Sequence, residues 1–309
     1  MKVFITPRGF ATYGLDQIER MRAAGLEVDY NNTGKSYTKE QFMEKAKDAE
    51  GIILGVDDMS APVLEQLPKL RVIARYGVGV DNIDLDYCKE HGIHVGRSIG
   101  SNSLSVAEHA LAMMFCDAKN LYTTIRGIKA GGWDKPTGFE LTGKTVGIVG
   151  FGAIGRHLAR LCRGIGMNVM VYDVVEIPED LVVEQGLTVA TLDEIIEQAD
   201  FISIHVPLLD STRDLIAAPE MKRMKKNVCI VNAARGGIVN EKDLYEALVS
   251  GEVRSAVFDT FSSEPPAPGE PLLELDNFLL TSHTGSRTVE ADINTCRITT
   301  DIIMEHIGL

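Results

Sequence analysis

The sequence predicts an α/β protein made of two doubly wound domains, each with a parallel sheet covered by helices. Short apolar runs alternate with helical segments along nearly the whole chain, a pattern typical of repeated strand–helix units. Near the middle, the stretch KTVGIVGFGAIGRHLARLC (residues 144–162) joins one such strand to one such helix through a glycine-rich turn. A chain of 309 residues with 45% hydrophobic content is long enough to bury two cores.

The segment from Met1 to about Gly96 is expected to form most of the smaller domain. Apolar runs suited to strands occur at KVFIT, LEVDY, GIILG and LRVIAR, and helices are expected between them, near residues 15–24, 39–47 and 62–67. The loop ARYGVGVDNIDL follows the last of these strands. Because ligands bind at the carboxyl ends of parallel strands, we expect this loop, anchored by Arg75, to contact a ligand. A plain turn explains Gly77 and Gly79 equally well.

The residues after this loop predict one long helix over 101–131, with Ser103 or Ser105 as its N-cap. Its apolar positions are expected in the core or against a second copy of the chain: Leu104, Ala107, Leu111, Met114 and Phe115. Beyond residue 173, the runs FISIHVPL, NVCIVNAARGG, RSAVFDTF and NFLLTSH predict strands. Helices are expected between them, near residues 192–198, 219–225 and 241–248. Residues 286–309 predict an amphipathic helix that returns to cover the first domain.

The glycine-rich turn has the spacing GxGxxG. Gly150 makes the turn, Gly152 lets the backbone approach a pyrophosphate, and Gly155 allows the helix to pack closely on the strand. A glycine-rich turn without a ligand has the same spacing. The next apolar run, however, ends in Asp173, 23 residues after Gly150, where a carboxylate can accept hydrogen bonds from an adenosine ribose. No Arg or Lys follows directly, which favours NAD over NADP.

Composition limits the class of partner. The formal net charge of −13 argues against nucleic acid and anionic membranes as general partners. The five cysteines are scattered without CxxC spacing, which favours a reduced, cytoplasmic protein and predicts no metal site. The amino-terminal residues do not have the pattern of a signal peptide, and no run approaches the length of a membrane span, so we expect neither secretion nor membrane insertion.

Three polar residues follow predicted strands of the second domain. Arg235 follows VNAA, Glu264 lies in FSSEPP, and His283 ends NFLLTSH. Each alone has a simpler explanation: a helix-capping arginine, a solvated glutamate and a packed imidazole. Together they indicate an active site, because strands deliver all three to the edge of the sheet where the cofactor is expected.

At this point the sequence resembles the D-isomer-specific 2-hydroxyacid dehydrogenase family, which includes D-3-phosphoglycerate dehydrogenase. The resemblance covers essentially the whole chain and rests on RYGVGVDNID, NSLSVAEHA, GFGAIG with Asp173, HVPL, VNAARGGIV, FDTFSSEPP and SHTGSRTVEA, in family order. It implies a flavodoxin-like substrate-binding domain (1–100 plus 286–309) and a Rossmann NAD-binding domain (101–285). It also implies hydride transfer between NAD and a small anionic D-2-hydroxy or 2-oxo acid, and a homodimer.

The resemblance also implies roles for single residues. Arg235, Glu264 and His283 are expected to act together in catalysis, and Asp259 is expected to bind the nicotinamide carboxamide. The main-chain N–H groups of Tyr76, Gly77, Val78 and Gly79 are expected to hold the substrate carboxylate. The other expected cofactor contacts are Ala153, Ile154, His205, Val206, Pro207, Ala233, Ala234 and Gly285.

The side chains suit this chemistry. The planar guanidinium of Arg235 can pair with a carboxylate and a 2-oxo group while it polarises the carbonyl. His283 can give a proton to the oxygen as hydride reaches C2, and Glu264 can hold its other ring nitrogen.

The sequence leaves the identity of the substrate open. Phosphoglycerate dehydrogenases commonly carry an arginine just after the strand that reads GIILG here, whereas this chain has Gly55, Val56, Asp57 and Asp58 there. Arg75 is the remaining cation, and glyoxylate or hydroxypyruvate reduction fits as well as oxidation of phosphoglycerate. An NAD-sensing corepressor that binds peptides is the alternative from another class. The chain ends at Leu309, so we expect no C-terminal regulatory domain.

Overall fold

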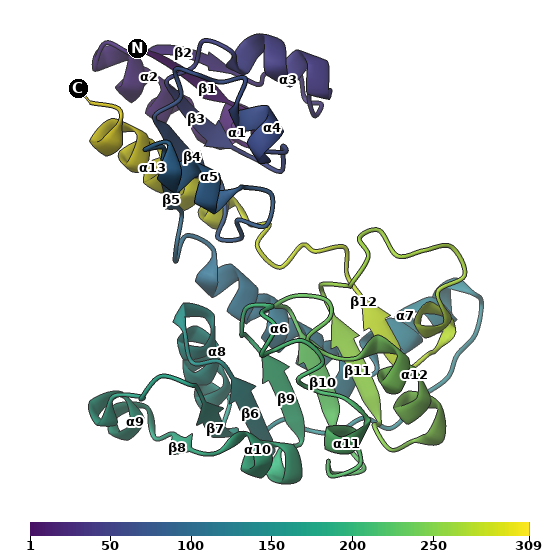
Figure 1. Cartoon of the computed structure of the whole chain (residues 1–309). Helices are drawn as coiled ribbons and strands as arrows, with labels where there is room; N and C mark the ends of the chain where they lie inside the picture. Colours follow the sequence, from purple (N-terminus) through teal and green to yellow (C-terminus); the bar gives the residue numbers. More distant parts are fainter. Residues whose placement is uncertain (309) are drawn as a thin grey trace. The chain divides into compact units, whose positions relative to one another are not determined.

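The computed structural model describes residues 1–308 and contains two compact units. Unit 1 comprises residues 1–102 and the segment that starts at Arg287, and unit 2 comprises Ser103–Ser286. Each unit has one parallel sheet with helices on both faces (Figure 1). The predicted α/β class with two doubly wound sheets is therefore confirmed.

Unit 1 has a sheet of five strands in the order β2-β1-β3-β4-β5, which is flavodoxin-like. The strands are β1 (Lys2–Ile5), β2 (Glu27–Tyr30), β3 (Gly51–Leu54), β4 (Val72–Arg75) and β5 (His94–Arg97). One face is covered by α3 (Lys39–Ala46), α4 (Ala61–Leu64) and α5 (Leu85–Glu90). The other is covered by α1 (Phe10–Tyr13), α2 (Leu15–Ala23) and α13 (Val289–His306).

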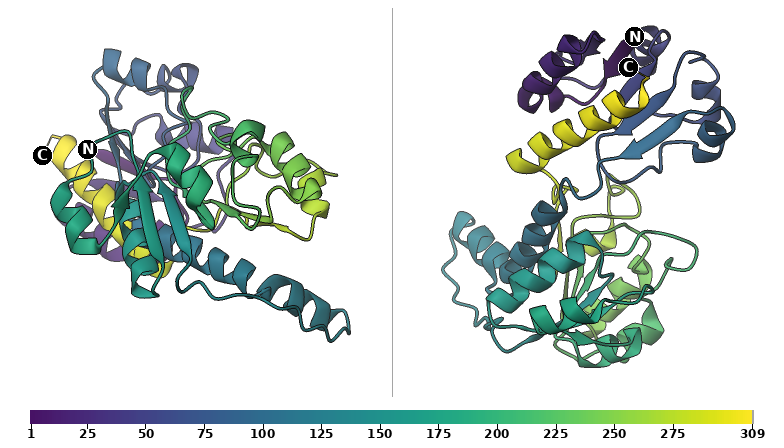
Figure 2. Two further views of the ribbon diagram at one scale, coloured as in Figure 1. Left: turned by 90° about the horizontal axis from the view of Figure 1, so that it is seen from below. Right: turned by 90° about the vertical axis from the view of Figure 1, so that its left-hand side faces the viewer.

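The last helix, α13, belongs to unit 1 although it lies at the far end of the sequence. It runs along the sheet beside β3 and β4, as the yellow helix in Figure 2 shows. Thr288 caps its first turn by accepting the Ala291 N–H. Apolar side chains of this helix, including Cys296 and Ile303, fill the core against β4. Burial of this face explains why the first 100 residues do not complete their own core.

Unit 2 has a sheet of seven strands in the order β12-β11-β10-β9-β6-β7-β8. The strands are β6 (Thr145–Val149), β7 (Asn168–Tyr172), β8 (Thr188–Val189), β9 (Phe201–Ile204), β10 (Cys229–Asn232), β11 (Ser255–Phe258) and β12 (Phe278–Leu280). The order reverses between β6 and β9, and in such sheets ligands bind at the carboxyl ends of the strands that flank this point.

The helices of unit 2 form two layers around this sheet. α6 (Ser103–Ala118) and α8 (Ala153–Gly164) cover one face. α10 (Leu192–Gln198), α11 (Ala218–Met221) and α12 (Glu241–Ser250) cover the other, with the short η1 (Pro271–Glu274) beside β12. α7 (Leu121–Lys129) and α9 (Glu179–Gln185) bury no residue within the described chain.

The long helix predicted over 101–131 is two helices. Asn120, between α6 and α7, has a φ of 53°, in the left-handed region that ends a right-handed helix. Of the two predicted N-caps, Ser103 is the first residue of α6. Ser105 lies inside the helix, and its hydroxyl donates to the Gly285 carbonyl, so its prediction as the N-cap is wrong. Leu104, expected on the apolar face, is 40% exposed. The other four expected positions, Ala107, Leu111, Met114 and Phe115, are buried or half-buried in the core of unit 2.

Several elements were not predicted. The edge strands β5 and β8 have mostly exposed or half-buried residues, so they lack the apolar run that marks a strand in the sequence. Helices α1, α5 and α9 were also not predicted, and each is at most seven residues long. In the described part of the chain, no helix has the length and apolar character needed to cross a membrane.

We expect Gly147→Ala to destabilise unit 2. A Cβ at Gly147 in β6 would lie 2.3 Å from Ile195 Cγ2 on α10 and 3.2 Å from the Cβ of Ala199, the residue that follows this helix. Because this face is closely packed, the free energy of unfolding should fall by about 1–3 kcal/mol in urea titrations followed by circular dichroism.

Gly164→Ala in α8 is the matched control for this substitution. No described atom lies within 4 Å of a Cβ added there. This variant should be neutral or more stable by up to about 1 kcal/mol. Equal stability of Gly147→Ala and the wild type would show that α10 does not pack this closely on β6.

Candidate active site

The glycine-rich turn follows β6, where the strand order of unit 2 reverses. Gly150 has a φ of +100°, and a Cβ on it would lie 2.7 Å from the main-chain carbonyl carbon of His205. A Cβ on Gly155 would lie 2.2 Å from the Gly150 carbonyl oxygen. In contrast, no described atom comes within 4 Å of a Cβ placed on Gly152. Two of the glycines therefore serve close packing, and the third leaves its backbone open to a ligand.

The N-terminus of α8 suits an anion. The helix starts at Ala153 with Gly152 as its N-cap, and within the described chain no side chain caps it and no acidic residue lies in its first turn. Its first N–H groups can therefore bind phosphate oxygens. Asp173 follows β7, and its carboxylate accepts the N–H groups of Phe151 (2.7 Å) and Val175 (3.0 Å). A carboxylate has about four acceptor positions, which leaves some for ribose hydroxyls.

The segment after β9 brings a neutral histidine to the same edge. His205 Nε2 lies 2.8 Å from Ser203 Oγ. Burial lowers the pKa of His205 to about 4, so its imidazole is uncharged at neutral pH. Its Nδ1 is buried and has no hydrogen-bond partner in the described chain. Such an atom is available to a bound ligand.

The turn after β10 carries Arg235. Buried Asn232 holds this turn: its Oδ1 accepts the Ala234 N–H (3.1 Å) and its Nδ2 donates to the Arg235 carbonyl (2.9 Å). Arg235 itself donates from Nη1 to the Ala234 carbonyl at 2.8 Å. A Cβ on Gly236 would lie 2.1 Å from the carbonyl carbon of Phe261. The turn with Arg235 thus lies directly against the loop after β11, which contains Glu264.

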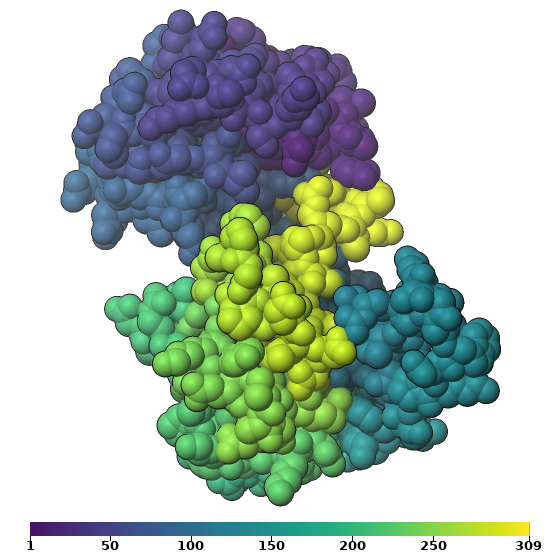
Figure 3. Space-filling view, turned by 90° about the vertical axis from the view of Figure 1, so that its right-hand side faces the viewer, coloured from purple at the N-terminus to yellow at the C-terminus, as the bar shows by residue number. Residues whose placement is uncertain are grey.

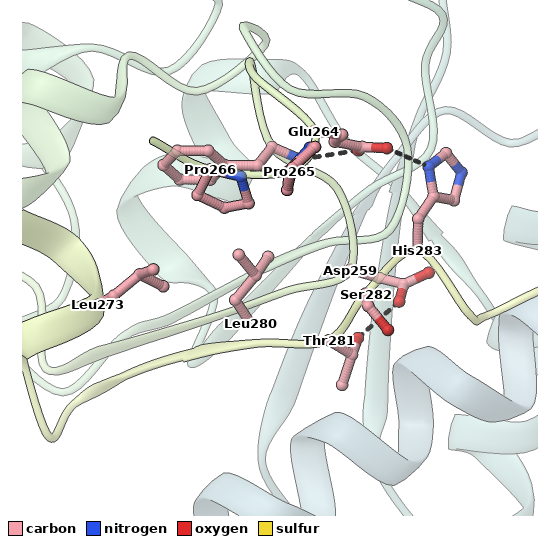
Figure 4. Close-up of a pocket in the computed structure, with 10 residues that line it drawn as sticks. Asp259, Glu264, Pro265, Pro266, Leu273, Leu280, Thr281, Ser282 and His283 are labelled. Atoms are coloured by element: carbon pink, nitrogen blue, oxygen red, sulfur yellow. Dashed lines mark hydrogen bonds and ion pairs between the residues drawn. The ribbon is translucent and has the colours of Figure 1, made fainter. Parts of the chain in front are cut away.

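Glu264 and His283 form a hydrogen-bonded pair (Figure 4). His283 Nδ1 lies 2.8 Å from Glu264 Oε2, and Glu264 Oε1 accepts the Phe261 N–H at 3.0 Å. The glutamate is therefore fixed by its own loop and orients the imidazole. The side chains of His283 and Glu264 are 45% and 41% exposed, so Nε2 can reach a ligand. A carboxylate–imidazole pair of this kind can hold and transfer a proton.

His283 has a φ of +54°, a left-handed conformation that costs a residue other than glycine roughly 1–3 kcal/mol. Asp259, which follows β11, holds the turn around it. Its Oδ1 accepts the Thr281 hydroxyl (2.5 Å) and the Thr284 N–H (2.8 Å), and its Oδ2 accepts the Gly285 N–H (2.8 Å). The carboxylate thus contacts the chain on both sides of His283.

The charge of Asp259 is maintained despite its burial, since the residue is only 2% exposed. Burial alone would raise the pKa, but hydrogen bonds from His109, Thr281, Thr284 and Gly285 outweigh it and lower the pKa to about 2. Asp259 was expected to bind a nicotinamide carboxamide. In the structure its oxygens are engaged by the turn that carries His283, a role that sequence reasoning missed.

A cavity of about 450 Å³ adjoins the pair. Its wall is mostly apolar and includes Phe261, Pro265, Pro266, Leu273 and Leu280, with Glu264 and His283 at one side (Figure 4). A cavity of this size can hold a small organic molecule.

In unit 1, the predicted carboxylate-binding loop follows β4. The Tyr76 N–H donates to the Leu54 carbonyl (2.9 Å), and the Gly77 N–H donates to Ser98 Oγ (2.8 Å). The N–H groups of Val78 and Gly79 have no hydrogen-bond partner within the described residues. Of the four expected donors, these two are therefore the ones available to an anion.

The side chains of Arg75 and Tyr76 brace this loop. Arg75 donates to three main-chain carbonyls, those of Gly79 (2.8 Å), Tyr76 (2.9 Å) and Leu54 (3.3 Å). The hydroxyl of Tyr76 donates to Asp292 Oδ1 on α13 at 3.0 Å, and burial raises its pKa. The suggestion that Arg75 is available as a phosphate-binding cation is thus not supported by its contacts.

The structure places the other predicted residues as follows. The expected cofactor contacts lie in the first turn of α8 or in segments that follow strands of unit 2: Gly150, Gly152, Ala153, Ile154, Gly155, Asp173, His205, Val206, Pro207, Ala233, Ala234, Asp259 and Gly285. Arg235, Glu264 and His283 lie at the same edge. Sequence reasoning missed Ser105, His109 and Thr281, whose hydrogen bonds hold the His283 turn. A histidine amid the apolar residues of a predicted helix was the available signal.

Similarity to known proteins agrees with this geometry. Residues 111–285 match the family model described as D-isomer specific 2-hydroxyacid dehydrogenase, NAD binding domain. The chain is 41% identical to D-3-phosphoglycerate dehydrogenase of Methanocaldococcus jannaschii over 86% of its own length and 51% of that protein. It is 38% identical to hydroxypyruvate reductase of Thermotoga maritima, with 88% of each chain covered.

Among solved structures, the fold is similar to that of D-lactate dehydrogenase from Aquifex aeolicus complexed with NAD and lactic acid. That similarity has a TM-score of 0.80 at 29% identity and covers 98% of this chain and 94% of the other. The chain spans about half the length of the archaeal D-3-phosphoglycerate dehydrogenases that it matches. From the sheet order, the glycine-rich turn and these similarities together, the chain belongs to the D-isomer-specific 2-hydroxyacid dehydrogenase family.

Proposed function

We propose that this protein is an NAD-dependent oxidoreductase that interconverts a D-2-hydroxy acid and its 2-oxo acid by hydride transfer. The observation that carries the proposal is the Glu264–His283 pair, held at the sheet edge that also bears the glycine-rich turn. Unit 2 binds NAD, and unit 1 binds the substrate. Bound NADH supplies the hydride.

The protein's own residues supply the rest of the chemistry. The guanidinium of Arg235 binds the carboxylate and 2-oxo group of the substrate and polarises the carbonyl. His283 gives the proton from Nε2 to the oxygen as hydride reaches C2, and takes it back during oxidation. Glu264, at 2.8 Å from Nδ1, keeps the imidazole in position. The N–H groups of Val78 and Gly79 supply further donors for the substrate carboxylate.

For the substrate, we propose an unphosphorylated 2-oxo acid such as hydroxypyruvate or glyoxylate. Asp57 Oδ2 accepts the Thr6 hydroxyl at 2.5 Å, so a carboxylate is held where β1 and β3 end. Asn82 Nδ2 donates to the Asp57 carbonyl (2.6 Å) and so ties this loop to the one that contains Val78 and Gly79. A phosphate dianion next to this carboxylate would be repelled. Arg8, two residues after Thr6 in the sequence, is an exposed cation.

We also propose a homodimer and a cytoplasmic location. α7 exposes apolar side chains at helical spacing, namely Leu121, Tyr122, Ile125 and Ile128, and Trp133 beyond it is 77% exposed. In Figure 3 this teal segment stands at the margin of unit 2. Burial against the same segment of a second copy would remove this apolar surface from water. The five cysteines are free thiols, which supports a reducing compartment.

NADH consumption with a panel of 2-oxo acids tests the activity. We expect turnover of hydroxypyruvate or glyoxylate with a kcat/KM at least about tenfold above that for 3-phosphohydroxypyruvate, since about 1.4 kcal/mol of repulsion is sufficient. NADPH should be used less well, because Asp173 would repel a 2′-phosphate. A preference for the phosphorylated acid that disappears in Arg8→Ala would contradict the assignment of the Asp57 loop and make Arg8 the phosphate ligand.

Two substitutions test the role of His283. The imidazole gives a proton during reduction and takes one back during oxidation, so its removal should slow both directions. Glu264→Gln removes the carboxylate that holds Nδ1 in position and should also lower kcat in both directions. His283→Ala should lower kcat roughly 10²- to 10⁴-fold while NADH affinity, measured by fluorescence, is kept. A His283→Ala enzyme with unchanged turnover would disprove this role.

Sedimentation tests the dimer. The wild type should have about twice the chain mass of 33.7 kDa, and Ile125→Asp should shift it toward the monomer, because a buried unpaired charge is strongly unfavourable. Val183→Asp on α9, where Val183 is 73% exposed, is the matched control and should stay dimeric. A monomeric wild type, or equal effects of both variants, would refute the assignment of α7.

A further inference from the structure

The helix α6 faces the turn that carries His283. His109 Nε2 on this helix lies 3.1 Å from Thr281 Oγ1 and 3.4 Å from Asp259 Oδ1. Ser105 lies four residues earlier, on the same side of the helix, and donates to the Gly285 carbonyl at 2.6 Å. One face of α6 therefore contacts both ends of the turn 281–285.

His109 is the first donor in a series of hydrogen bonds that runs through Thr281 to Asp259. The hydroxyl of Thr281 has one proton, which it donates to Asp259 Oδ1 at 2.5 Å. The Thr281 oxygen is then the acceptor for His109 Nε2–H. The Asp259 carboxylate also accepts hydrogen bonds from the N–H groups of Thr284 and Gly285. His109 thereby fixes the rotamer of Thr281 and contributes a donor beside a buried carboxylate.

This contact leaves little free space. A Cβ on Gly285 would lie 2.9 Å from Asp259 Oδ2 and 3.4 Å from His109 Cδ2. The side chain of His109 is 23% exposed and that of Asp259 is 3% exposed. Because the turn is packed directly on the imidazole, its conformation depends on the ring being present and on the donor being correctly placed.

We propose that His109 is a positioning residue that acts from α6 through Thr281 and Asp259 to hold His283 in its left-handed conformation against Glu264. It does not contact substrate in this role. The inference depends on the proposed function of His283, because only then does the geometry of the turn set the rate. Loss of a residue that only packs would lower the stability of the protein. It would not lower kcat selectively while KM stays the same.

The test compares His109→Leu, which removes the donor, with His109→Gln, whose amide can donate from a similar position. His157→Leu on α8 is the matched control, since His157 is half-buried and has no side-chain hydrogen bond within the described residues. The measurements are kcat and KM for hydroxypyruvate and glyoxylate with NADH, NADH affinity by fluorescence, and hydrogen–deuterium exchange of the peptide that contains residues 281–285.

We expect His109→Leu to lower kcat about tenfold to a hundredfold with KM and NADH affinity within about twofold of the wild type, as for a misplaced catalytic group. The N–H groups of Thr284 and Gly285 should exchange faster in this variant. His109→Gln should recover most of the rate and the protection, and His157→Leu should match the wild type.

Two results would overturn the proposal: an unchanged kcat in His109→Leu, or a loss that His109→Gln does not rescue. If His109→Leu does not fold, Ser105→Ala tests the same face of α6, and unchanged exchange and kcat there would also reject it. A wild type without turnover on any 2-oxo acid would refute the proposed function instead. In that case, the exchange of residues 281–285 in the variants still decides whether His109 holds the turn.

Discussion

The buried carboxylate of Asp259 is the interaction on which the candidate site depends. It lies at the end of β11 and binds the turn after β12 through the Thr281 hydroxyl and the N–H groups of Thr284 and Gly285. These bonds help to offset the cost of the left-handed conformation of His283. The same bonds keep the carboxylate charged, since they outweigh the effect of burial on its pKa. A single buried charge thus links a core strand to the residue proposed to transfer the proton.

The glycines of unit 2 allow the loops to meet at one edge. Gly236 lets the β10 turn contact the loop with Glu264, and Gly285 lets the β12 turn contact Asp259 and His109. In each case, a Cβ would lie within 3 Å of an atom on another loop. The close approach of the backbones, rather than any single side chain, brings the guanidinium, carboxylate and imidazole to the same edge.

Unit 1 uses a different device for its proposed anion site. The loop after β4 is braced by Arg75, whose guanidinium bonds the loop's own carbonyls, and by Asn82, which bonds the Asp57 loop. These contacts hold the loop that carries the N–H groups of Val78 and Gly79. In a chain of net charge −13, backbone donors of this kind offer an anion a local site that needs no excess of positive charge.

The sequence by itself determined the fold class, the glycine-rich turn with Asp173, and the three candidate catalytic residues. Strands and helices have a local hydrophobic period, and the turn and the catalytic motifs are short contiguous stretches. It did not determine the break in the helix after Ala118 or the edge strands β5 and β8. Nor did it reveal that Ser105 and His109 bond to the turn after β12. The residues joined by these two hydrogen bonds are 180 and 172 positions apart in the sequence. Hydrogen bonds between such distant segments depend on how the strands order themselves in the sheet. That ordering is a property of tertiary packing, which no local pattern of residues encodes.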